Sequence, residues 1–120
     1  MKLILFYEKP GCVTNTKQKK ILKESGCLVI TRNILELQMN QAELFSYLKD
    51  KPLCEWFNPN APKMKNKQID TSALSLESAL ALLLCEPILI RRPLLNINGQ
   101  HICGFDKKMI EDALGMKLMH

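Results

Sequence analysis

The sequence lacks the paired cysteine motifs on which structural zinc sites and small disulfide frameworks are built. No Cys-x-x-Cys pair occurs, the cysteines are odd in number and irregularly spaced, and histidine is present only twice. We therefore expect no metal site, and free thiols in a reducing compartment. The cysteines are Cys12, Cys27, Cys54, Cys85 and Cys103.

Long apolar runs are missing as well. The longest, Ala79–Cys85, has the length of a buried helix and falls far short of the ~20 residues of a membrane span. Glu8, Lys9 and Pro10 interrupt the apolar run at the N-terminus, which makes that run too short for a signal peptide. We therefore expect a soluble, cytoplasmic protein that makes no contact with a membrane.

Aromatic residues are few, at 6% against 47% hydrophobic residues, so the expected core consists of Leu, Ile, Met and Val. No Pro-, Gly- or Ser-rich linker occurs, and residues 1–120 are expected to form one domain. The net charge of +5 comes mainly from lysines at 17–23 and 63–67. Because no aromatics alternate with these lysines, we expect no nucleic-acid contact. A solvated surface, an anionic small molecule or an acidic protein partner remain as explanations of the charge.

The N-terminal part of the chain predicts a β-α-β unit. Leu3–Tyr7 reads as a buried strand, residues 13–25 as a helix that Gly26 ends, and Cys27–Ile30 as a second strand, with an extension to Ile34 left open. Two strands joined by a helix of this length should be parallel.

A helical insertion at about residues 38–86 follows. Asn40 is expected to cap a helix over 41–48, with Glu three residues on as in a reciprocal capping box. Ser75 is expected to cap a helix over 76–85, which is apolar on nearly every side and should therefore be buried.

The middle of the insertion is less regular. Residues 53–57 predict a short helix, and 58–62 a loop because of their Asn and Pro content. Trp56 and Phe57 are expected to anchor the insertion to the sheet.

The C-terminal part predicts β-β-α. Two short strands, 93–97 and 101–105, are joined at Asn98-Gly99, which is a strong signal for a two-residue hairpin turn. Asp106 should cap a helix over 107–114, and the last five residues should fray.

Five stretches carry a family resemblance, namely FYEKPGC (6–12), NTKQK (15–19), EWFNPNAPK (55–63), PILIRRPLL (87–95) and GFD (104–106). They resemble the arsenate reductase (ArsC)/Spx/YffB family, and most closely its nitrogenase-associated, ArsC-like subgroup. The resemblance implies an α/β fold, namely a thioredoxin-like βαβ–ββα mixed sheet with a helical insertion.

The resemblance also implies three roles. Cys12 stands where ArsC-type reductases carry their nucleophilic thiol, Arg92 where they carry an arginine that binds the oxyanion, and Pro93 where they carry a cis-proline beside the active-site loop.

The sequence departs from that pattern at three positions. Glu8 stands where the reductases usually carry a histidine, and a carboxylate there would disfavour a thiolate. Their further oxyanion-binding arginines align near Asn58 and at Gly104. Arg91 could replace one of them, but neighbouring residues on a strand point to opposite faces. These departures count against arsenate reduction.

Cys12 has two interpretations, a reactive thiol or a small buried hydrophobe. If a helix begins at residue 13 or 14, Cys12 lies near its N-cap, where free N–H groups and the helix dipole stabilise a thiolate or a bound anion. Thr14 and Asn15 are close enough to donate hydrogen bonds, Arg92 could approach from the side of the cis-proline, and Asn58 could hydrogen-bond into the site. We favour the reactive thiol.

The other cysteines are expected to play smaller parts. Cys27 and Cys85 lie in apolar contexts and are predicted to be in the core, while Cys54 could be either buried or exposed. Cys103 should lie near the site, and a disulfide with Cys12 is the minor alternative. A cycle of one thiol, resolved by glutathione or another small thiol, fits the missing Cys-x-x-Cys better.

Three hypotheses of function follow. The first is a thiol oxidoreductase with Cys12 as nucleophile, no bound cofactor, glutathione as co-substrate, and a small thiol or an anionic molecule as substrate. The second is a non-enzymatic adaptor or regulator, Spx-like or nitrogenase-associated, that binds a protein partner through the insertion. The third and least favoured is an arsenate reductase proper.

Overall fold

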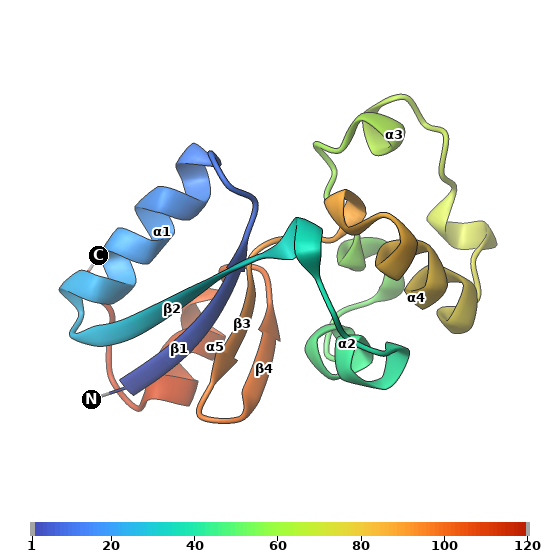
Figure 1. The fold of residues 1–120 in the computed structure, drawn as a ribbon. Coiled ribbons are helices and arrows are strands. Elements are labelled where there is room, and N and C mark those ends of the chain that lie inside the picture. Colours follow the sequence, from blue (N-terminus) through green and yellow to red (C-terminus); the bar gives the residue numbers. More distant parts are fainter. Residues whose placement is uncertain (1, 120) are drawn as a thin grey trace.

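The computed structural model describes residues 2–119, and its centre is a four-stranded mixed sheet in the order β2-β1-β3-β4 (Figure 1). β1 (Lys2–Glu8) pairs in parallel with β2 (Cys27–Asn33), which confirms the predicted β-α-β unit. β1 also pairs antiparallel with β3 (Leu94–Ile97), and β3 forms a hairpin with β4 (Gln100–Cys103). The arrangement is the thioredoxin-like α/β fold that the resemblance implies.

One face of the sheet is covered by α1 (Val13–Glu24) and α5 (Lys107–Leu114). Side chains alternate between the two faces of a strand, and Ile4 and Phe6 of β1 point into this core, where both are fully buried. Leu3, which points to the opposite face, is 42% exposed. The first strand is therefore buried on this face, as expected, and only partly covered on the other, where Tyr7 packs against the insertion.

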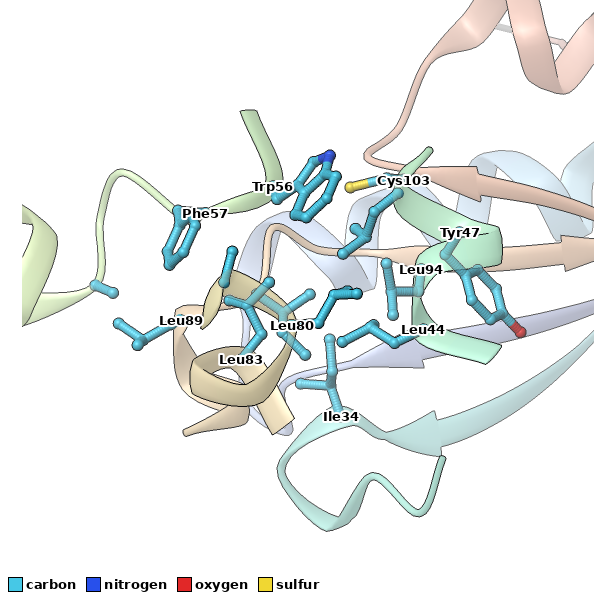
Figure 2. Close-up of a cluster of buried hydrophobic side chains, with 14 residues drawn as sticks. Ile34, Leu44, Tyr47, Trp56, Phe57, Leu80, Leu83, Leu89, Leu94 and Cys103 are labelled. Atoms are coloured by element: carbon cyan, nitrogen blue, oxygen red, sulfur yellow. The ribbon is translucent and has the colours of Figure 1, made fainter. Parts of the chain in front are cut away.

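The opposite face of β3 and β4 packs against the segment between β2 and β3. This insertion contains α2 (Gln41–Leu48), α3 (Pro62–Lys65) and α4 (Leu76–Cys85), linked by short 3₁₀ turns. Figure 2 shows its core, in which Leu94 and Cys103 of the sheet meet side chains of the insertion.

Trp56 and Phe57 lie in the same core, only 2% and 1% exposed, and so anchor the insertion to the sheet as predicted. Trp56 is the last residue of a 3₁₀ turn that begins at Leu53, where the sequence predicted a short helix. Its indole N–H donates to the carbonyl of Lys51 at 2.9 Å.

The predicted helix caps are confirmed. The side chains of Asn40, Ser75 and Asp106 each accept a hydrogen bond from the backbone N–H three residues on. The N–H of Met109 holds the pKa of the Asp106 carboxyl below its ordinary value, with the Lys51 ammonium adding to the effect. Gly115 ends α5 in the left-handed conformation, with φ at 70°.

One prediction for the insertion is wrong. Helix α4 buries one face through Ala79, Leu80 and Leu83, but Leu76 is 52% exposed and Cys85 is exposed, so the helix is not surrounded by core. Its partner, α2, covers one side only, and apolar composition alone could not reveal that. The expected loop over 58–62 is confirmed for residues 58–61, and Pro62 begins α3, where proline is well tolerated.

The C-terminal tail does not fray over the residues that the structure describes. Leu118 is 8% exposed, and its N–H donates to the Glu111 carboxylate at 2.8 Å. The N–H of Met119 donates to the Ser25 hydroxyl at 2.9 Å. The tail thus fastens α5 to the end of α1, while residue 120 lies outside the described range.

Candidate functional site

The site begins with a tight turn after β1. The N–H of Cys12 donates to the carbonyl of Lys9 at 3.1 Å, with Pro10 and Gly11 at the two central positions. Gly11 has φ at +82°, which a type II turn requires at its third residue and which only glycine adopts without strain. Proline and glycine in this order therefore fix where Cys12 lies.

Cys12 is the N-cap of α1, as predicted. The helix starts at Val13, and the Cys12 sulfur accepts the backbone N–H of Asn15 at 3.4 Å. A thiolate in this place is stabilised by that N–H and by the positive end of the helix. The side chain is partly exposed, so an incoming reagent can reach it.

A surface hollow of about 210 Å³ opens beside the sulfur. It brings together the residues that the sequence had suggested from distant parts of the chain, and the Arg92–Pro93 peptide bond at its edge is cis. The lining residues are Cys12, Thr14, Asn15, Asn58, Pro59, Asn60, Arg91 and Arg92.

Two arginines, Arg91 and Arg92, line this hollow, and no carboxylate is among its lining residues. Within residues 2–119, the Arg92 Nη1 atom is buried and has no hydrogen-bond partner. Arg91 donates through Nε to the carbonyl of Glu55 and also borders a neighbouring hollow that contains the Glu55 and Asp106 side chains. Arginine beside the Cys12 hollow favours an anionic ligand there, because guanidinium groups form strong hydrogen bonds with oxyanions and carboxylates.

Arg91 corrects the sequence-based argument. The two arginines were expected to point to opposite faces of a strand, but β3 begins only at Leu94, so the strand's alternation does not apply to them. The Arg91 side chain also passes Gly104, where its Cδ would lie 3.5 Å from an added Cβ. An added Cβ would make only an ordinary contact there, so the feature that favours glycine at 104 is its φ of +82°.

Asn58 reaches the hollow from the insertion. Its N–H donates to the Leu89 carbonyl at 2.7 Å, beside a bridge that pairs Phe57 with Ile90. Its Oδ1 accepts the N–H of Asn60 at 3.0 Å, which fixes the orientation of the carboxamide. The Nδ2 amide of Asn58 can then donate a hydrogen bond to a ligand.

Thr14 and Asn15 differ in what they can offer. Thr14 is exposed at the mouth of the hollow. Asn15 is only 2% exposed, and its carboxamide already bonds the N–H of Lys9 and the side chain of Gln18. Both ends of its side chain are thus bonded within the protein, and its backbone N–H donates to the Cys12 sulfur.

Glu8, the carboxylate that the sequence marked as unfavourable, lies in an ion pair with Lys19 of α1. Both side chains are largely buried, at 13% and 18% exposure. The ammonium group therefore offsets the negative charge that would otherwise oppose a thiolate at Cys12.

This pairing can be tested by charge removal. Lys19→Met should leave the Glu8 carboxylate unpaired and slow the alkylation of Cys12 at neutral pH about threefold or more. The double variant Glu8→Gln/Lys19→Met should restore the rate. Lys17→Met, which removes an exposed lysine from the same helix, is the control and should change little. An equal effect of Lys17→Met would show that only net charge matters.

The remaining cysteines are poor substitutes for Cys12. Burial raises the pKa of the Cys103 thiol to about 12, and Cys103 is 1% exposed. Burial also raises the pKa of Cys27, which lies in the core as predicted. Cys54 and Cys85 are exposed, so the core position predicted for Cys85 is wrong. All five cysteines, within the described part of the chain, are free, and Cys12 and Cys103 form no disulfide.

Two further observations concern residues 2–119. No group of three or more His, Cys, Asp or Glu side chains is arranged to hold a metal ion. None of the helices in this range has the length and apolarity that crossing a membrane would take.

Comparisons with known proteins agree with this geometry. The family model of ArsC matches residues 7–113. An uncharacterized 15.7 kDa protein from the draG 3′ region of Rhodospirillum rubrum is 39% identical over 113 residues, which are 94% of this chain and 79% of that protein. Global transcriptional regulator Spx 2 of Bacillus cereus is 25% identical over 114 residues, covering 93% of this chain and 87% of the regulator.

Solved structures show the same fold. An ArsC-family-related protein of Bacteroides fragilis superimposes with a TM-score of 0.79 at 25% identity, covering 92% of this chain and 96% of the other. An arsenate reductase of Vibrio cholerae gives a TM-score of 0.72 at 22% identity, covering 96% and 98%. The similarity to the Vibrio cholerae structure shows a shared fold.

Proposed function

The chain belongs to the ArsC family, and from this premise we propose that it is a thiol oxidoreductase that works with the single nucleophile Cys12. The observation that carries the proposal is the position of the sulfur. It accepts a helix N-terminal N–H and borders a hollow with two arginines and no carboxylate. Such surroundings stabilise the thiolate, which is the reactive form of cysteine.

The proposed cycle uses one protein thiol and glutathione. The Cys12 thiolate attacks the glutathione sulfur of a mixed disulfide R–S–S–G, so that Cys12–S–S–G forms and R–S⁻ leaves. A glutathione thiolate then attacks the glutathione sulfur of Cys12–S–S–G, which releases the Cys12 thiolate and glutathione disulfide. Overall, R–S–S–G and one free glutathione give R–SH and glutathione disulfide, and a reducing compartment such as the cytoplasm supplies the free glutathione.

Glutathione as co-substrate fits the chemistry of the hollow. Its carboxylates are anions that Arg91 and Arg92 can bind, and Asn58 offers a further donor through Nδ2. Cys103 is an unsuitable resolving thiol because burial raises its pKa to about 12, which leaves almost no thiolate at neutral pH. An external thiol therefore completes the cycle.

The proposal predicts a selective mixed disulfide. When the protein is incubated with glutathione disulfide at neutral pH, Cys12 should be glutathionylated at least about tenfold faster than the more exposed Cys54 and Cys85. Peptide mass spectrometry measures each site in the same sample. Cys12→Ser should remove the fast reaction and leave the slow ones. Equal rates at the three cysteines would contradict a reactive Cys12.

A second candidate is a non-catalytic regulator that binds a protein partner. It is favoured by the relation to a protein named as a transcriptional regulator and by the exposed Lys65 and Lys67 on the insertion. In that case partner binding would survive Cys12→Ser. The same test applies to an association with nitrogenase-related proteins.

Arsenate reduction proper is the third candidate. The main objection to it is that the sequence lacks two of the expected arginines, and this objection is weakened because Arg91 lines the hollow together with Arg92. Turnover of arsenate with glutathione, well above the level of Cys12→Ser, would support it over the first candidate.

A further inference from the structure

We infer that Asn15 is a positioning residue that holds the Cys12 sulfur at the N-terminus of α1, rather than a residue that binds the substrate. The inference deepens the proposed function and rests on it, because it concerns the reactivity of Cys12. It starts from a buried polar side chain. Among residues 2–119, Asn15 and Asn58 are the two polar residues that are buried, and both border the Cys12 hollow.

The Asn15 carboxamide ties the turn to the helix. Its Oδ1 accepts the N–H of Lys9 at 3.3 Å, and its Nδ2 donates to Oε1 of Gln18 at 3.0 Å. Lys9 is the first residue of the turn that carries Cys12, and its carbonyl accepts the N–H of Cys12. The amide group of Lys9 is therefore held by Asn15 and its carbonyl by Cys12.

The backbone of the same residue contacts the sulfur, since the Asn15 N–H donates to Cys12 Sγ at 3.4 Å. One residue thus fixes both the turn and the donor that the thiolate needs. Without the carboxamide, the Lys9 N–H loses its partner and the turn can move relative to the first turn of α1. The sulfur would then spend less time in line with the N–H groups that stabilise its charge.

Asparagine suits this place because it supplies an acceptor and a donor at once. The acceptor receives the backbone N–H of Lys9, and the donor bonds the side-chain oxygen Oε1 of Gln18. An aspartate would keep the acceptor but lose the donor, and it would bring a negative charge close to the sulfur.

The charged groups near the sulfur are the same residues in the wild type and in an Asn15 variant. Arg91 and Arg92 line the hollow from the segment before β3, Lys9 lies in the turn, and Glu8 is paired with Lys19. Because no charge is added or removed, a change in the pH dependence of Cys12 in an Asn15 variant reports a movement of the turn, with its Cys12 sulfur and Lys9, relative to the helix.

The test compares Asn15→Ala with Gln18→Ala. Gln18→Ala removes the partner of Nδ2 but keeps the bond from Oδ1 to Lys9, so it matches part of the loss without freeing the turn. Alkylation of Cys12 by iodoacetamide, a neutral reagent, is followed against pH by peptide mass spectrometry. Cys54 in the same molecule serves as the internal reference.

In Asn15→Ala, the rate at neutral pH should fall about five- to tenfold, while the plateau rate at alkaline pH stays that of the wild type. Gln18→Ala should keep the wild-type profile. Asn15→Gln, which keeps the carboxamide but displaces it by one methylene group, should shift the profile as Asn15→Ala does, and serves if the alanine variant fails to fold.

The outcomes separate the inference from the proposed function. A lower melting temperature in Asn15→Ala with an unchanged pH profile would mean that Asn15 supports the fold only, and would overturn the inference. If the wild-type Cys12 reacts no faster than Cys54 at neutral pH, the proposed function itself fails. A profile that shifts equally in Gln18→Ala would show that the bond to Lys9 is not what matters.

Discussion

Replacement of Arg92 by alanine is expected to weaken anion binding at the Cys12 hollow about ten- to a hundredfold. A hydrogen bond to a charged group contributes ~1.5–3 kcal/mol, which corresponds to this range in affinity. The Arg92 Nη1 atom is buried and, among residues 2–119, has no hydrogen-bond partner, so an anion would supply the missing acceptor. Protection of Cys12 from iodoacetamide by sulfate or by glutathione disulfide measures the affinity.

A matched control removes the same charge from a different part of the molecule. Arg32 on β2 is exposed, and its guanidinium donates to the carbonyl of Thr31. Arg32→Ala should leave protection nearly unchanged when ionic strength is held constant, because exposed charges at a distance are screened. If both variants lost protection equally, or if sulfate failed to protect the wild type, Arg92 would not be an anion ligand.

Replacement of Trp56 by alanine should have the largest effect on stability, at about 3–5 kcal/mol of the free energy of unfolding. The indole is 2% exposed, packs edge-to-face on Phe45 with ring centroids 5.9 Å apart, and donates to the Lys51 carbonyl. The variant would leave a cavity between the insertion and the sheet, and the Lys51 carbonyl would lose its partner. Urea unfolding measures the loss.

Leu76→Ala in α4 is the control for Trp56→Ala, because Leu76 is 52% exposed and its truncation should change stability by less than about 0.5 kcal/mol. A loss below about 1.5 kcal/mol in Trp56→Ala would mean that the insertion does not depend on this anchor. Since Asn58 follows Trp56 closely, the variant should also disturb the hollow.

Local signals predicted the regular elements well. Asn40, Ser75 and Asp106 combine a side-chain acceptor with a following helical pattern, and each caps its helix in the structure. Asn98-Gly99 likewise forms the hairpin turn, with φ of 52° and 87°. These features depend on a few neighbouring residues, so they can be read without knowledge of the fold.

The features that were missed depend on distant contacts. Leu118 is buried because it reaches the α1/α5 core, which its neighbours in sequence do not reveal. The burial of one face of α4 is set by where α2 and the sheet lie, and the Arg91 side chain is held by its hydrogen bond to the Glu55 carbonyl. Composition could not separate these cases from their alternatives.

The site shows the same division. The turn Pro10-Gly11 and the helix start at Val13 were visible in the sequence and place Cys12 at the N-cap. The sequence marked Asn15 as a donor to substrate, but the structure engages its carboxamide with Lys9 and Gln18. The ion pair between Glu8 and Lys19 joins the end of β1 to a face of α1. The sequence could not show that these two residues are partners, because the contact depends on how the helix packs on the sheet.

The most direct test of the account is the rate of Cys12 alkylation by iodoacetamide against pH in the wild-type protein, with Cys54 as internal reference. We predict that Cys12 reaches its half-maximal rate at a lower pH than Cys54, because the N-terminus of α1 stabilises its thiolate. If Cys12 instead reached its half-maximal rate together with Cys54, the thiolate would not be stabilised, and the proposed oxidoreductase would be contradicted.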